Sequence, residues 1–190
     1  EQWDNWFDDW HELMITDEGR RIPIVPAIGN HETYGGSGAP FYYSRFVLPE
    51  PEKYYVFDYG PDLSVVTLDT HTAGVESQND WLRQTLKKRR ERPWKLVQYH
   101  KPVWSTTKGH NVKARDNWVP LFEKFGVSVV HEADAHAYKQ TVPIKDGEEN
   151  RENGIIYIGD GGWGAPLREP KDPDEHWWLH EAKRAYHIWK

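Results

Sequence analysis

The chain lacks cysteine altogether, which excludes disulfides, thiolate metal ligands and cysteine nucleophiles within its 190 residues. It also lacks any apolar run of the ~18 residues that a membrane-spanning helix needs, so we expect no membrane span. Basic residues are in the minority, with 24 Lys and Arg against 30 Asp and Glu and a formal net charge of −6. Because a duplex nucleic-acid partner needs a basic face, we expect no binding to duplex nucleic acid.

What remains is the composition of a globular domain, with 37% hydrophobic and 28% charged residues. The chain begins at Glu1 without Met or a signal peptide, so we expect a piece of a longer protein, truncated at both ends. Its 11 Trp suggest either a core built on large rings or a Trp-rich carbohydrate-binding domain. The helical spacing of Trp3, Trp6 and Trp10 favours the first interpretation, because it buries these rings on one helix face.

Apolar patterning predicts alternating strands and helices, which is typical of an α/β domain. Residues 34–53 are rich in Gly, Pro and Tyr and predict a long loop. One expected helix begins near Trp3, a second runs from a Ser77 cap to about Arg92, and a third ends at Gly126. The expected strands cover residues 22–28, 54–59, 63–68, 94–99, 127–130 and 155–158.

Four metal-capable side chains follow expected strands: Asn30, His100, Asp134 and His136. A lone histidine near a strand end is more often structural than a ligand. Strand ends that share one edge of a sheet bring distant residues together, so the joint occurrence favours one site. Nitrogen and oxygen donors without thiolates suit Mn, Fe and Zn ions engaged in hydrolysis.

Three segments carry a resemblance to a known family. Gly29-Asn30-His31-Glu32 resembles the Gly-Asn-His-Asp/Glu signature of the calcineurin-like metallophosphoesterases. His100-Lys101-Pro102 is similar to the His-x-Pro of the same family. Ala133-Asp134-Ala135-His136-Ala137-Tyr138 resembles the Gly-His-x-His-Ala-Tyr element of the purple acid phosphatase branch. The segments occur in the family's order and span most of the chain.

This resemblance implies a four-layer α-β-β-α sandwich of two mixed sheets. Residues 1–190 would form the central and C-terminal part of one catalytic domain, with the family's Asp-x-His and Gly-Asp motifs upstream of Glu1. The implied reaction is hydrolysis of a phosphate monoester or diester, from a small molecule or a nucleotide, by a metal-activated water at a dinuclear site. The implied cofactors are two Fe, Mn or Zn ions, and the implied location is secreted or periplasmic.

The resemblance also implies roles for individual residues. Asn30, His100, Asp134 and His136 would ligate metal. His31 would be the general acid, and His110 a second catalytic and phosphate-contacting histidine, unless it is a solvated loop residue. Arg115 would bind substrate, unless it is an exposed residue at a helix start. Glu32 and Asp69 would support the ligands, although Asp69 equally suits a turn cap.

Asp134 departs from the family pattern, because it stands where the branch has the first histidine of Gly-His-x-His. A carboxylate adds negative charge and a harder oxygen donor, which favours Mn or Fe over Zn. If Asp134 does not ligate, one metal site is weakened. The alternative function is then a metal-poor, non-catalytic phosphate-binding or interaction module on the same fold.

Overall fold

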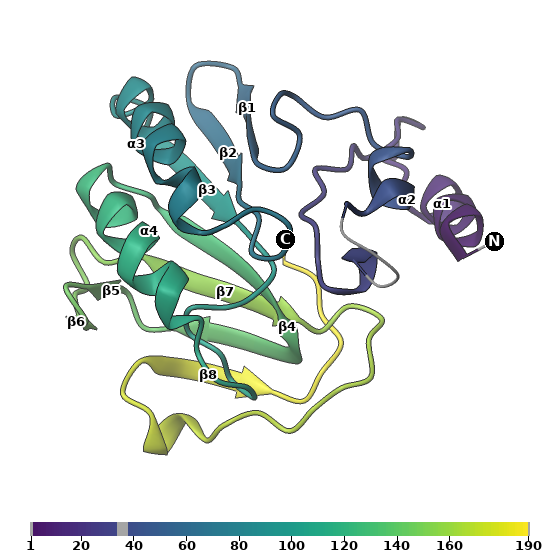
Figure 1. Ribbon diagram of the computed structural model, residues 1–190. Helices are drawn as coiled ribbons and strands as arrows, with labels where there is room; N and C mark the ends of the chain where they lie inside the picture. The colour runs from purple at the N-terminus through teal and green to yellow at the C-terminus, as the bar shows by residue number, and fades with distance from the viewer. Residues whose placement is uncertain (1, 34–37, 190) are drawn as a thin grey trace.

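The computed structural model describes residues 2–33 and 38–189, and its main element is a six-stranded mixed sheet (Figure 1). The order is β1-β2-β3-β4-β7, and β8 also pairs with β4. β2, β3, β4 and β7 are parallel, whereas β1 and β8 pair antiparallel with their neighbours. The expected mixed α/β class is therefore confirmed. The strands are β1 (Tyr55–Tyr59), β2 (Leu63–Thr67), β3 (Trp94–Gln98), β4 (Val129–Thr141), β7 (Ile156–Gly161) and β8 (Leu179–Lys183).

Two helices, α3 (Asn79–Lys88) and α4 (Val112–Lys124), lie over one face of this sheet (Figure 1). Alternate residues of the parallel strands, among them Val66, Val97 and Val130, are fully buried in the core. Ser77 does not cap α3 as expected: its hydroxyl donates to the Gly74 carbonyl, and a short 3-10 helix, Glu76–Gln78, precedes α3.

β4 makes a reversal that the sequence did not predict. Its first arm pairs with β7 in parallel, from Val129↔Ile156 to Glu132↔Gly159. After the register shift the pairing runs the other way, with Ala137↔Gly161 and Lys139↔Gly159. The chain thus passes around the end of β7 and returns on its other side, where it pairs with β8. Asp134 and His136 lie in this crossing, both with positive φ (71° and 61°).

The expected strand over residues 22–28 is wrong. The segment has no regular secondary structure, and it joins no ladder beyond the isolated Ile15↔Arg21 bridge before it. Pro23 and Pro26 remove two backbone donors within the segment, which prevents a regular ladder. Tertiary contacts hold it instead: Gln98 Nε2 donates to the Val25 carbonyl at 2.8 Å.

The N-terminal part contains α1 (Gln2–Leu13), the 3-10 helix η1 (His31–Thr33) and α2 (Pro40–Tyr43). α2 lies within the expected 34–53 loop, whose residues 34–37 are outside the described residues. Trp3, Trp6 and Trp10 do form one helix face, but they are half-buried and pack mainly on other rings. Trp163 contacts both Trp6 and Trp10, at 5.8–6.4 Å between ring centroids.

The remaining elements are short: β5 (Ile144–Lys145), β6 (Glu148–Glu149) and the 3-10 helix η3 (Pro173–Glu175). β5 and β6 pair as a two-stranded antiparallel sheet. Within residues 2–33 and 38–189 this hairpin is the only sheet besides the six-stranded one.

Candidate metal and phosphate site

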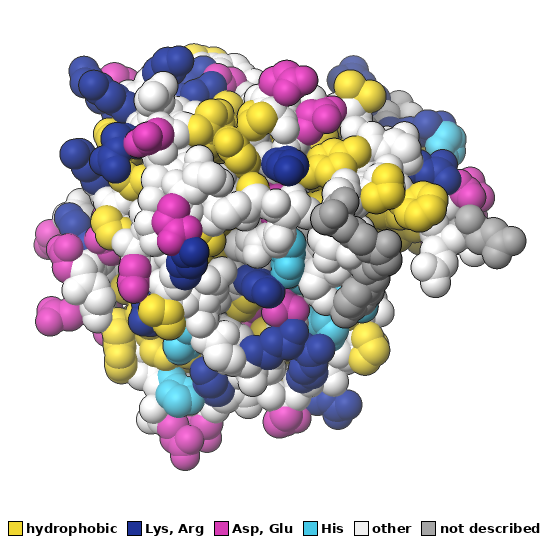
Figure 2. All heavy atoms as spheres, viewed as in Figure 1, with side chains coloured by type: hydrophobic (Ala, Val, Ile, Leu, Met, Phe, Trp, Pro, Cys, Tyr) yellow, Lys and Arg dark blue, Asp and Glu magenta, His cyan; other side chains and the backbone are white. Residues whose placement is uncertain are grey.

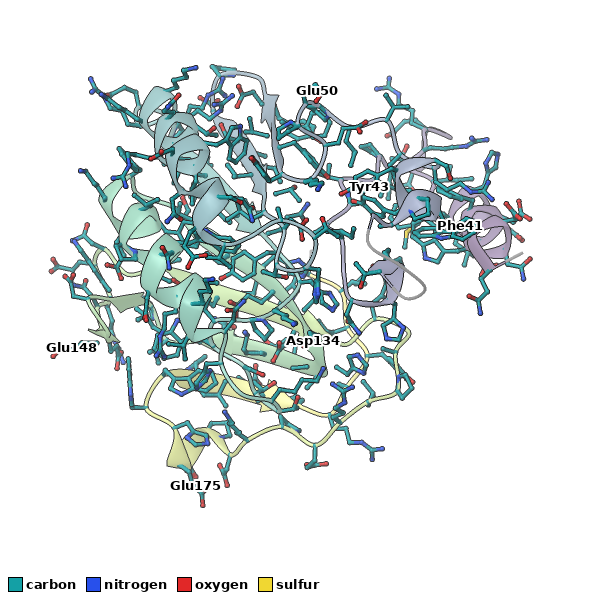
Figure 3. All side chains as sticks on the ribbon, in the orientation of Figure 1. Phe41, Tyr43, Glu50, Asp134, Glu148 and Glu175 are labelled. Carbon is teal, nitrogen blue, oxygen red and sulfur yellow. The ribbon has the colours of Figure 1, made fainter. Side chains whose placement is uncertain are left out.

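The parallel strands end at one edge of the sheet, and the polar residues follow them there. Asp69 comes after β2 and His100 after β3, while Asp134 lies in the crossing of β4 and Asp160 near the end of β7. Carboxyl ends of parallel strands share an edge, which is where α/β domains form their sites. Figure 3 places Asp134 at the tip of the β4 reversal.

Three of the predicted ligands converge. His100 Nε2 lies 2.8 Å from Asn30 Oδ1 and 3.6 Å from Asp134 Oδ1. Gly29 allows the close approach, because a Cβ at this position would lie 2.9 Å from the His100 ring. Glu32 accepts a hydrogen bond from the Gly29 amide at 2.8 Å and so fixes the turn that presents Asn30.

These donors suit a metal ion. Two donors bound at ~2.1 Å from one ion lie about 3 Å apart when they are perpendicular to each other and further apart at wider angles. The two distances from His100 Nε2, 2.8 Å to Asn30 and 3.6 Å to Asp134, fall in this range. The amide oxygen, imidazole nitrogen and carboxylate oxygen form a set that takes Mn, Fe or Zn. No group of three His, Cys, Asp or Glu side chains arranged for a metal occurs in the described part of the chain, so Asn30 is needed as the third donor.

His136 has the hydrogen bond expected of a ligand histidine. Its Nδ1 lies 3.0 Å from the Pro166 carbonyl, and a carbonyl can only accept, so Nδ1 carries the proton. This tautomer leaves Nε2 with a free lone pair, the usual arrangement in metal-ligating histidines. Burial lowers the pKa of His136, which favours the neutral ring that a metal requires. This state of the ring is compatible with ligation, but no described contact joins His136 to Asn30, His100 or Asp134.

Asp134 has a partner that the sequence analysis missed. Lys108 Nζ lies 2.6 Å from Asp134 Oδ1, across 26 positions of sequence. Hydrogen bonding from His100 and Lys108 holds the pKa of Asp134 well below its usual range, against the opposing effect of burial. Arg168 donates from Nη1 to the Asp134 carbonyl at 2.8 Å. The carboxylate is therefore ionised, with Lys108 on its side chain and Arg168 on the backbone carbonyl of the same residue.

His71 is a second residue that sequence reasoning overlooked. Its ring centroid lies 5.1 Å from that of His100, and its Nε2 is buried without a hydrogen-bond partner. Burial, together with His100 and Lys101, lowers the pKa of His71 to about 4, so the ring is neutral at pH 7. Asp69 holds the turn, accepting from the amides of His71, Thr72 and Ala73 at 2.6–2.9 Å. Asp69 is thus a turn cap that also fixes His71 beside His100.

His31 follows Asn30 directly and is exposed at the start of η1. It lines a groove of about 780 Å³ on the side of the site toward α1. Glu32 lies in the same wall, and the rest is largely aromatic. The rings that line this groove are Trp3, Trp6, Phe41, Tyr42, Phe46 and Trp163.

The structure places two predicted substrate contacts elsewhere. His110 packs against the Trp104 and Trp178 rings, and its Nδ1 accepts from the Ser105 amide at 2.9 Å. Burial lowers the pKa of His110 to about 4, so it is neither a solvated loop histidine nor charged at pH 7. Arg115 lies over the Trp104 ring at 5.4 Å. Neither side chain contacts Asn30, His100 or Asp134 among the described interactions.

A buried ion pair lies beneath the crossing of β4. Glu132 and Lys139 face each other across Gly159, both fully buried, and their side chains form a short ion pair. Glu132 also accepts from the Val103 amide at 2.7 Å, and Lys139 donates to the Trp104 carbonyl at 2.7 Å. The pair therefore ties both arms of β4 to the loop that follows β3.

The fold and the site define a mixed α/β domain with nitrogen and oxygen donors gathered at the carboxyl edge of its parallel strands. A family model described as calcineurin-like phosphoesterase matches residues 2–138, and the chain belongs to this family. The match includes the segments around Asn30, His100, Asp134 and His136.

Two curated relatives indicate the branch, and one solved structure matches the fold. Purple acid phosphatase 21 of Arabidopsis thaliana is 31% identical over 176 residues, which cover 82% of this chain and 40% of that protein. Fe(3+)-Zn(2+) purple acid phosphatase 12 of the same plant is 25% identical over 197 residues, covering 85% and 40%. The structure of purple acid phosphatase PPD1 from yellow lupin (Lupinus luteus) superposes with a TM-score of 0.77 at 23% identity, covering 96% of this chain and 37% of that one.

The expected resemblance to the purple acid phosphatase branch is thus confirmed. The chain spans 40% of the first of these relatives, so it corresponds to well under half of a protein of that kind. No helix in the described residues is long and apolar enough to cross a membrane.

Proposed function

We propose that the protein containing this chain hydrolyses phosphate esters at a dinuclear metal site, in the manner of the purple acid phosphatases. The observation that supports this most directly is the convergence of Asn30, His100 and Asp134 at one sheet edge. Residues 1–190 would supply the central and C-terminal part of the catalytic domain. The substrate would be a phosphate monoester or diester of a small molecule or nucleotide.

Each residue would have a distinct task in this function. Asn30, His100, Asp134 and His136 would hold metal, preferentially Mn or Fe because Asp134 is a carboxylate. Bound there, the metal would polarise the phosphoryl oxygens and make water more acidic. His31, next in sequence to Asn30 and exposed to the groove, would donate a proton to the leaving oxygen. His110 and Arg115 stay in the proposal only as supports of the loop after β3, given their contacts with Trp104.

A secreted or periplasmic location belongs to the same proposal and rests on the resemblance to the branch. It can be tested by fractionating cells that express the full gene. Recovery of the protein in the cytoplasm would contradict it.

The deciding experiment uses the full protein and a chromogenic phosphate monoester. Activity should be lost on treatment with a chelator and recovered with Mn or Fe, more fully than with Zn. A chromogenic diester assayed in parallel assigns the ester class. Full activity in the presence of chelator, with no metal retained by the protein, would rule out the metal-dependent reaction.

A second function is supported by one observation, the Lys108 ammonium on Asp134. The lysine ammonium in that position can take the place of a metal ion, which suits a metal-poor module that binds phosphate without hydrolysing it. This candidate predicts phosphate binding that survives chelation and no turnover with any metal. The chelation experiment therefore separates the two functions.

A further inference from the structure

Lys108 lies in the loop between β3 and α4, and its position is fixed by neighbouring hydrogen bonds. Thr107 Oγ1 donates to the Ala135 carbonyl at 3.0 Å, which attaches the loop to the residue after Asp134. The Lys108 amide donates to Ser105 Oγ at 3.0 Å, and Thr106 bonds to the buried Asp160 through its amide at 3.1 Å. The lysine is therefore held beside Asp134 by its loop, independently of its own side chain.

The Asp134 side chain is 10% exposed, whereas the Lys108 side chain is 41% exposed. A carboxylate so far removed from water needs a cation or several donors to stay ionised. Lys108 meets this need with one of its three N–H bonds. No other side-chain or backbone acceptor contacts its ammonium among the described residues, so the remaining donors face solvent.

Two cations contact Asp134, at different groups of the residue. Lys108 contacts its side chain and Arg168 its carbonyl, so two cations accompany one anion. On the face shown in Figure 2, Lys and Arg side chains gather next to histidines around the centre of the molecule. A surplus of positive charge beside donor groups attracts an anion, and ammonium groups bind phosphoryl oxygens strongly.

We infer that Lys108 and Asp134 act as one unit, in which Asp134 orients the ammonium and Lys108 binds a phosphoryl oxygen of the substrate. This inference rests on the proposed phosphate-ester function and names a substrate-binding residue for that same site. The unit explains why a buried carboxylate and a partly exposed lysine occur together at the tip of β4.

The test measures binding of inorganic phosphate to the manganese-loaded full protein by calorimetry. Lys108→Met should raise the Kd of phosphate by about tenfold or more, the range expected for loss of a hydrogen bond to a charged group. Lys108→Arg, which keeps the charge, should stay within about threefold of the unchanged protein. Where Lys108→Met does not fold, as judged by circular dichroism, Lys108→Gln replaces it.

Lys113→Met is the matched control. Lys113 forms an ion pair with Glu76 at 2.7 Å and is 58% exposed, so this variant removes the same charge on α4. Its Kd of phosphate should remain within about twofold, because exposed charges are screened by salt.

A double-mutant cycle then tests whether the two residues act together. Asp134→Asn should be assayed at a manganese concentration that restores the metal content of the unchanged protein. It should then weaken phosphate binding at least as much as Lys108→Met, and the double variant should be little worse than Asp134→Asn alone. The inference would be overturned if the two substitutions raised the Kd of phosphate by factors that multiply in the double variant, or if Lys108→Met left the Kd unchanged. Because phosphate binding is measured without turnover, a protein that binds phosphate through Lys108 but hydrolyses no ester would contradict the proposed function alone.

Discussion

Asn30 Oδ1 lies 2.8 Å from His100 Nε2, although 70 positions separate the two residues in the chain. His100 follows β3, whereas Asn30 follows a segment that belongs to no strand. The Gln98–Val25 hydrogen bond holds that segment beside β3, two residues before His100. Gly29 then lets the His100 ring lie close to the backbone that precedes Asn30, so that the donors meet.

Gly29→Ala should weaken metal binding without unfolding the protein. The new Cβ would lie 2.9 Å from the His100 ring and 3.0 Å from Glu32 Oε2, so the ring must shift. A misdirected ligand typically costs about 10–100-fold in metal affinity, which competition with a chromogenic chelator measures. Gly74→Ala is the control, since its Cβ would meet only Ser77 at an ordinary 3.5 Å. Equal metal affinity in both variants would contradict a role for the Gly29–His100 approach in metal binding.

Asp134→Ala in the full protein should remove a charged ligand and lower metal content. The loss in affinity should be at least the ~10–100-fold typical of a disturbed metal shell. Asp134→His should retain metal and shift the preference toward Zn, because imidazole suits Zn better than a carboxylate does. Metal analysis after dialysis against a Mn/Zn mixture measures both effects. Normal metal content and turnover in Asp134→Ala would show that Asp134 is not a ligand.

His31→Ala should behave differently from the ligand variants. It should keep its metal and lose about 10²–10⁴-fold in turnover, because it removes a proton donor rather than a ligand. The loss should be smaller with a substrate whose leaving group is already acidic, such as a nitrophenol. An equal loss of turnover for a nitrophenol and for an alkyl alcohol as leaving group would argue against the role of general acid.

Breaking the buried Glu132–Lys139 pair should destabilise the domain. Lys139→Met leaves Glu132 buried and uncompensated, which typically costs about 3–5 kcal/mol. The double variant Glu132→Gln/Lys139→Met should recover much of this loss, since no charge remains buried. Urea unfolding of the full protein, followed by tryptophan fluorescence, measures the difference.

The surface pair Lys183–Glu181 provides the control for this experiment. Its atoms lie 2.5 Å apart, but the side chains are 62% and 39% exposed. Lys183→Met should therefore change the free energy of unfolding by about 0–1 kcal/mol. A similar loss of unfolding free energy in Lys139→Met and Lys183→Met would show that burial of the ion pair does not determine its contribution to stability.

Several parts of the fold were predictable because their signals are local. Alternating apolar residues placed β1, β2 and β3 to within one residue of their observed ends. The prediction failed over residues 22–28, where Pro23 and Pro26 interrupt an otherwise strand-like apolar run. It also ended β4 too early, because Val130 is followed by a polar stretch whose only apolar residues up to Ala137 are alanines.

The family, the α/β class and the candidate donors could be read from the sequence, since short motifs and periodicity encode them, although the strand expected before Asn30 does not form. Which of these donors meet depends on the tertiary structure. It joined Asn30, His100 and Asp134, turned His136 toward Pro166, and placed His110 among tryptophans. It also brought Lys108 to Asp134, a contact that no local pattern predicts. Such contacts depend on the crossing of β4 around β7 and on the loop between β3 and α4, which a Thr107 hydrogen bond attaches to that crossing.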